Sequence, residues 1–131
     1  GLYFLHQTHH WQTGGEKYYS DHLLFQRLYE EILPEIDSLA EKIIGLESIR
    51  LVNQVHQIRH IEEFITLATL NPDGLVARSL VAELAFVKSG ELAMEELKGT
   101  KLLTPGLEQS IGNILDLHES HLYLLKRRYT I

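Results

Sequence analysis

Histidine and carboxylate side chains recur at fixed spacing near the start of the chain. His22 lies twelve positions after His10, and Asp37 and Glu41 follow His22 at fifteen and nineteen positions. Imidazole nitrogens and carboxylate oxygens are the ligands with which proteins hold redox-active iron. Residues four apart lie on one face of a helix, so Asp37 and Glu41 can reach one ion together. The pattern is therefore typical of a metal site, of a kind that can hold redox-active iron.

Helices are the elements that must position these side chains. Apolar residues recur three and four positions apart along the whole chain, and no segment shows the sustained alternation of a strand. The spacing predicts five helices, over about 1–12, 17–45, 48–69, 75–98 and 105–131.

Glycine and proline mark the expected helix ends. Gly14 and Gly15 close the first helix, and Gly45 is the expected stop of the second. The run Asn-Pro-Asp-Gly at 71–74 separates the third from the fourth, and Thr-Pro at 104–105 begins the fifth. Pro34 falls inside the second helix, where we expect a bend rather than a break, because the apolar stripe continues through it.

The fold class that follows is all-α. Four long helices, with one short extra helix in the connection between the second and third, describe a four-helix bundle with a crossover. At 131 residues the chain is expected to be a single domain, 1–131. Its first residues read as the middle of a helix, so we expect that the first helix is truncated at its N-terminus.

Composition excludes several function classes. The net charge of −6 disfavours a protein that binds polyanions such as DNA. The basic run at 126–128 is expected to interact favourably with the dipole at the C-terminal end of the last helix. We therefore expect no DNA binding from these residues. Cysteine is absent, which excludes thiolate metal sites and fits a reducing cytoplasm. No apolar run approaches the roughly 18 residues of a membrane span. We expect a soluble, cytoplasmic protein without a membrane partner.

A resemblance to a known family rests on a set of positions in the N-terminal third. These positions are His10, Trp11, Gly15, His22, Asp37 and Glu41. Together they resemble the iron-oxidising site of the Dps family of mini-ferritins. Residues 18–29 and 39–46 look like that family's second helix, and His118-Glu119 looks like a pattern near its C-terminal end. The resemblance implies a ferritin-like arrangement of the bundle.

The resemblance also implies a function. It implies a hollow homo-oligomer of twelve subunits with an iron site at each twofold interface. His10 and His22 would come from one subunit, and Asp37 and Glu41 from its partner, with Trp11 beside the site. The implied activity is that of a ferroxidase. It would oxidise Fe²⁺, with hydrogen peroxide as the expected oxidant, store ferric iron and protect against oxidative stress.

One position departs from the family pattern. Residue 26, four after His22, is Gln where the family usually has Asp, so the site has one neutral oxygen in place of an anionic pair. Asp21 is no substitute, because it lies about 100° around the helix from His22. We expect that the first iron still binds and that a second is weakened. The alternative is a non-catalytic shell protein with an impaired site.

The remaining histidines are interpreted as surface or core residues rather than as metal ligands. His56, His60 and Glu63 share a helical face that could hold a metal, but a solvated surface is the favoured interpretation. His118 lies on the apolar stripe of the last helix, which is typical of a hydrogen-bonded core residue.

A di-iron centre inside the bundle is not expected. Conventional di-iron bundles use Glu-x-x-His within a helix, and no glutamate of this chain has histidine at the third following position.

His6 and His9 are assigned no role.

Overall fold

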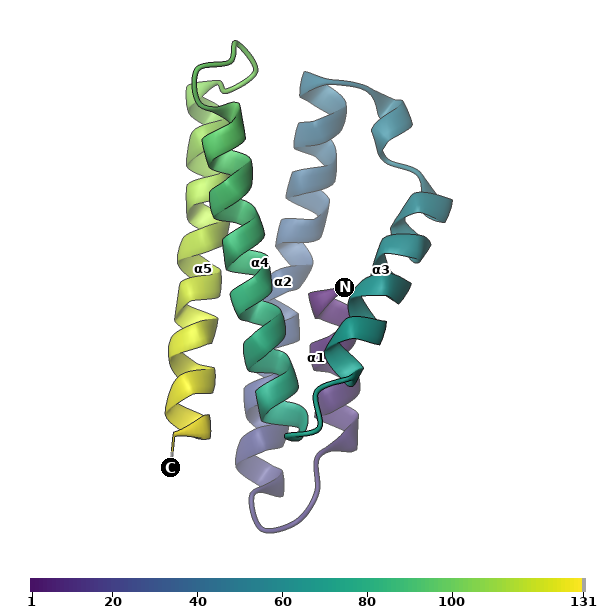
Figure 1. Ribbon diagram of the computed structural model, residues 1–131, viewed down its shortest axis with the longest axis vertical. Helices are drawn as coiled ribbons and strands as arrows, with labels where there is room; N and C mark the ends of the chain where they lie inside the picture. Colours follow the sequence, from purple (N-terminus) through teal and green to yellow (C-terminus); the bar gives the residue numbers. More distant parts are fainter. Residues whose placement is uncertain (131) are drawn as a thin grey trace. The chain divides into compact units, whose positions relative to one another are not determined.

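Helices are the only regular structure in residues 1–130, the part of the chain that the computed structural model describes. They are α1 (Leu2–Gln12), α2 (Tyr18–Leu46), the 3₁₀ helix η1 (Ile49–Leu51), α3 (Gln54–Thr69), α4 (Leu75–Leu97) and α5 (Pro105–Tyr129), as Figure 1 shows. None of these helices is long and apolar enough to cross a membrane. The all-α prediction is confirmed, and the ferritin-like arrangement remains a prediction.

The chain divides into two compact units. The first comprises Gly1–Ser79 and the second begins at Leu80.

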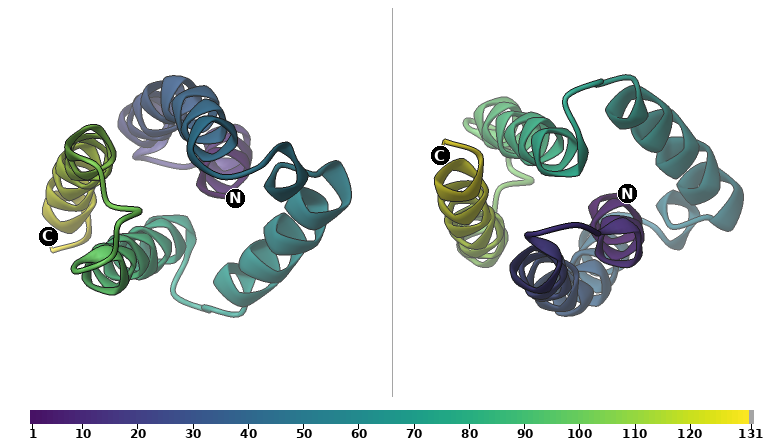
Figure 2. Two further views of the ribbon diagram at one scale, coloured as in Figure 1. Left: turned by 90° about the horizontal axis from the view of Figure 1, so that it is seen from above. Right: turned by 90° about the horizontal axis from the view of Figure 1, so that it is seen from below.

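In the first unit, α1 and α2 lie side by side in opposite directions (Figure 2). Leu5 of α1 and Phe25 and Leu28 of α2 are buried, the last two completely. The turn between the helices needs a residue with positive φ, and Gly15 supplies it at +83°. The α1–α2 pair therefore brings the histidines of α1 next to the start of α2.

The second helix contains a proline in its interior. α2 continues through Pro34 as one helix, so the expected absence of a break is confirmed, while the expected bend stays a prediction. Gly45 is not the stop, because it lies inside the helix and its φ is not positive. The helix ends one residue later, at Leu46.

The third helix begins later than the apolar spacing predicts. Residues 49–51 form a 3₁₀ turn, and α3 starts only after Asn53. The Asn53 side chain accepts from the backbone N–H groups of Val55 and His56, at 2.9 and 3.2 Å. This cap fixes the helix start and corrects the predicted range of 48–69. Phe64 of α3 lies against Gly1, where an added Cβ would approach the ring to 2.7 Å.

In the second unit, α4 and α5 form an antiparallel hairpin (Figures 1 and 2). Thr104 caps α5 through its hydroxyl, which accepts from the N–H of Leu107 at 3.1 Å. Gly90 permits close approach of the two helices, since a Cβ there would clash with the Leu115 side chain. The predicted start of α5 is confirmed.

Candidate metal centres

His10 and His22 form a reciprocal pair across the α1–α2 interface. Nδ1 of His10 donates to the carbonyl oxygen of His22 at 2.8 Å, and Nδ1 of His22 donates to the carbonyl oxygen of His10 at 2.9 Å. The two rings stack with their centroids 3.7 Å apart and their planes 23° from parallel. The structure therefore brings together the two predicted imidazole ligands.

These hydrogen bonds fix the tautomer of both rings. A carbonyl oxygen accepts but cannot donate, so the proton lies on Nδ1 in each neutral ring. The lone pair of Nε2 then remains available, which is the arrangement of most metal-binding histidines. The His10–His22 pair can thus offer two Nε2 atoms as metal ligands.

Aromatic rings surround this pair. Tyr18 stacks on His22 with a centroid separation of 5.0 Å, and Tyr29 contacts His10 edge-on at 5.4 Å. Burial, followed by the nearby Glu30 and Tyr3, raises the pKa of Tyr29 above its usual value. Trp11, expected beside the site, has an exposed fraction of 67%. The Trp11 ring could shield the site from water only if another protein surface covers the ring.

The two predicted carboxylates lie elsewhere on the same chain. Asp37 and Glu41 are exposed and share one face of α2. Asp37 is fifteen residues beyond His22, which is about 22 Å along a helix at 1.5 Å per residue. One chain therefore does not bring all four predicted ligands together.

Gln26 is engaged with a neighbour on its own helix. Its Nε2 donates to Oε1 of Glu30 at 2.9 Å. The side chain at the departed ligand position therefore offers a neutral amide whose nitrogen is already bonded.

A second group of metal-type side chains is buried in the α4–α5 hairpin. Glu83, His118 and His121, which we name the Glu83 cluster, each have at most 1% of their side chains exposed. Nδ1 of His118 lies 2.6 Å from Oε2 of Glu83, and Nδ1 of His121 lies 3.2 Å from Oε1. One ligand atom from each of the three lies within 4.8 Å of the others.

The helices position this cluster. His118 and His121 are three apart and so share one face of α5. Glu83 lies two turns before Gly90 on α4, at the level that the antiparallel pair brings opposite His121. The ring of Phe86 lies 4.3 Å from that of His118 and supplies an apolar neighbour.

The Glu83 cluster is not among the sites predicted from the sequence. A search for Glu-x-x-His looks within one helix, whereas this cluster takes its carboxylate from α4 and its imidazoles from α5. Two signals were present: Glu83 is the one charged residue in the apolar run 80–87, and His118 and His121 share a helical face. The interpretation of His118 as a buried, hydrogen-bonded residue is confirmed.

His6 and His9 share the hydroxyl of Ser79. Their Nδ1 atoms lie 2.9 and 2.7 Å from its oxygen, and all three residues are buried. A hydroxyl has one proton, so it donates to one Nδ1 and accepts from the other, and the rings adopt opposite tautomers. Burial, then the nearby His6 and Arg78, lower the pKa of His9 to about 4. His9 is therefore neutral near pH 7.

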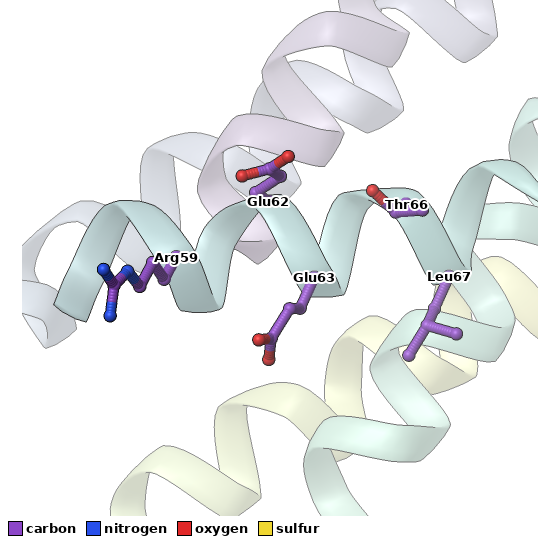
Figure 3. A pocket seen from close by; sticks show the side chains of 5 residues that line it. All are labelled: Arg59, Glu62, Glu63, Thr66 and Leu67. Carbon is purple, nitrogen blue, oxygen red and sulfur yellow. The ribbon is translucent and has the colours of Figure 1, made fainter. Parts of the chain in front are cut away.

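The histidines of α3 lie on a solvated surface, as expected. His56, His60 and Glu63 are exposed. Glu63 lines an open hollow along α3, and Figure 3 shows its carboxylate on a different side of the helix from that of Glu62. Arg59, Thr66 and Leu67 complete the lining, so a single helix forms the hollow.

No known protein family, curated protein or solved structure matches the chain.

Proposed function

We propose that the protein binds and oxidises Fe²⁺ with hydrogen peroxide, at sites made by His10 and His22 of one copy and Asp37 and Glu41 of another. The observation that carries the proposal is the reciprocal hydrogen bonding of His10 and His22. Both Nδ1 atoms are bonded to carbonyl oxygens at 2.8 and 2.9 Å, which leaves both Nε2 atoms for a metal.

The chemistry follows from the donor types. Neutral imidazole holds Fe²⁺, and hard carboxylate oxygens stabilise Fe³⁺, which lowers the barrier to electron loss. Peroxide accepts two electrons, so two Fe²⁺ and one H₂O₂ give two Fe³⁺ and two OH⁻ without releasing a hydroxyl radical. Ferric storage and protection from oxidative damage are the consequences of this reaction in a closed shell.

A second copy of the chain is needed to complete the site. If two α2 helices pack in opposite directions about a twofold axis, His22 of each comes level with Asp37 and Glu41 of the other, and two sites form at once. Leu23, Leu33 and Ile36 of α2 have exposed fractions of 44%, 55% and 46%. Such apolar exposure supports an interface on this helix. Twelve subunits is the assembly that the Dps resemblance favours.

A second candidate is a shell protein that binds iron but oxidises it poorly. The bond from Gln26 to Glu30 favours this alternative, because position 26 offers a neutral oxygen where an anionic ligand would assist a second iron. The rate of iron oxidation separates the two candidates.

The direct test is stopped-flow oxidation of Fe²⁺ by peroxide, with the native protein and with His10→Asn and His22→Asn. We expect each substitution to slow the reaction by roughly tenfold or more, as loss of a metal ligand should. His56→Asn, on the exposed face of α3, is the matched control and should leave the rate unchanged. Equal rates in all variants, or a stable monomer in solution, would overturn the proposal.

A further inference from the structure

We propose that Glu83, His118 and His121 form a second metal site, inside the α4–α5 hairpin, for a divalent first-row transition metal such as Fe²⁺, Mn²⁺ or Zn²⁺. All three ligands belong to one copy of the chain and to one unit of it. The site therefore does not need the assembly on which the proposed iron oxidation depends.

The donor set determines the class of ion. Two imidazole nitrogens and one carboxylate oxygen suit Fe²⁺, Mn²⁺ and Zn²⁺, while Mg²⁺ and Ca²⁺ prefer oxygen ligands throughout. Cysteine is absent from the chain, so the thiolate sites that favour Cu⁺ are excluded. The two-histidine, one-carboxylate set is also the donor set of many non-haem Fe²⁺ sites.

The ligand atoms already lie within 4.8 Å of one another. Each oxygen of the Glu83 carboxylate faces one imidazole, with Oε2 directed at His118 and Oε1 at His121. Both rings present the same atom, Nδ1, toward the carboxylate. No ring has to turn over to admit an ion, so the cluster has the orientation that a three-ligand site requires.

The separations show how the site would open. Metal–ligand bonds of about 2.1 Å place neighbouring donor atoms roughly 3.0 to 3.4 Å apart. The distance between His121 and Glu83, 3.2 Å, already falls in this range, whereas that between His118 and Glu83, 2.6 Å, is shorter. A small rotation of the Glu83 side chain would admit the ion. The hydrogens on the Nδ1 atoms would leave as the metal takes their place.

The Glu83 cluster is buried from solvent. The exposed fraction is 0% for Glu83, 1% for His118 and 0% for His121. Removing ionisable groups from water costs several kcal/mol per ion, and apolar residues of similar volume commonly pack as well or better. Metal binding explains why a carboxylate interrupts the otherwise apolar run 80–87.

Co²⁺ titration of the whole chain tests the site, with Co²⁺ as a coloured substitute for the native ion. The background protein carries His10→Asn and His22→Asn, which removes the proposed interface site. We expect one equivalent of Co²⁺ to bind and to develop visible d–d absorption. We make three substitutions in this background, Glu83→Gln, His118→Asn and His121→Asn. Each should weaken the affinity for Co²⁺ by roughly 100-fold or more, which exceeds the loss expected for a residue that only hydrogen-bonds to a metal ligand.

His56→Asn and His60→Asn in the same background are the matched controls, because both residues are exposed. Their affinity for Co²⁺ should not change. Full Co²⁺ affinity in folded Glu83→Gln, His118→Asn and His121→Asn proteins would overturn the proposal.

Anomalous scattering decides the matter even if these variants fail to fold. Crystals of the His10→Asn, His22→Asn protein soaked in Co²⁺ should show a peak within bonding distance of Oε1 or Oε2 of Glu83 and of both imidazoles. A peak elsewhere, or no peak, would overturn the second site. Because both imidazoles of the interface site are replaced, this outcome is independent of the proposed iron oxidation.

Discussion

The imidazole of His10 donates to the backbone carbonyl of His22, and His22 returns the same bond to the carbonyl of His10. The exchange links α1 to α2 and fixes the tautomer of both rings before any metal arrives. A hydrogen bond that supports the fold thus also prepares a ligand.

Replacing His22 with Phe separates stacking from hydrogen bonding. Phe keeps a ring against His10 but removes both nitrogen atoms, so we expect the free energy of unfolding to fall by about 0.5–1.5 kcal/mol, the net value of one hydrogen bond. Urea unfolding measures the change. Trp11→Phe is the control, because its ring is 67% exposed and its loss should alter stability little. Equal stability of His22→Phe and the native protein would contradict the assigned bond.

Gln26→Asp should accelerate peroxide-driven oxidation of Fe²⁺, since it places an anionic ligand four residues after His22. The same change breaks the Gln26–Glu30 hydrogen bond and sets two carboxylates one turn apart. We therefore expect a loss of about 0.2–0.5 kcal/mol in stability. Adding Glu30→Gln should restore stability and keep the faster rate. An unchanged rate in folded Gln26→Asp would show that Gln26 does not limit the reaction.

Ser79→Ala should destabilise the first unit. It removes the hydroxyl that the Nδ1 atoms of His6 and His9 share inside the protein, and the expected loss is about 1–3 kcal/mol. Ser89→Ala, on an exposed position of α4, is the matched control and should change stability by less than about 0.5 kcal/mol. Equal urea midpoints for the two variants would rule out a structural role for the shared hydroxyl.

Stability should fall as the pH is lowered from 6.5 towards 4. The unfolded His9 takes up a proton near its usual pKa of 6.5, whereas the folded residue does so only near 4. The contribution of His9 is therefore complete above pH 6.5 and declines below it, by at most about 1.4 kcal/mol per pH unit. Urea unfolding at pH 7 and 5 should show a shallower decline for His9→Gln. Parallel declines would contradict the lowered pKa.

The sequence was informative where local spacing decides the structure. Apolar spacing predicted the helices, and Thr104 marked the start of α5 at the residue where the cap is observed. The start of α3 was predicted too early, because the apolar stripe runs through residues 48–53 while Asn53 caps the helix. Capping by one side chain outweighed periodicity there.

The candidate sites show the same limit. The Dps resemblance implied that His10 and His22 come from one subunit, and the short turn between their helices brings the two imidazoles together. Glu83 is 35 residues from His118, and only the antiparallel packing of α4 and α5 brings them together. A pattern confined to one helix carries no information about such a pair.

The most direct measurement is anomalous scattering at the iron edge from crystals of the native protein soaked anaerobically in Fe²⁺. We predict a peak within bonding distance of Nε2 of His10 or His22 and of Asp37 and Glu41 from a second copy of the chain. Iron at that interface would support the proposed oxidation site. Absence of iron there, or ligands beyond bonding distance, would contradict it.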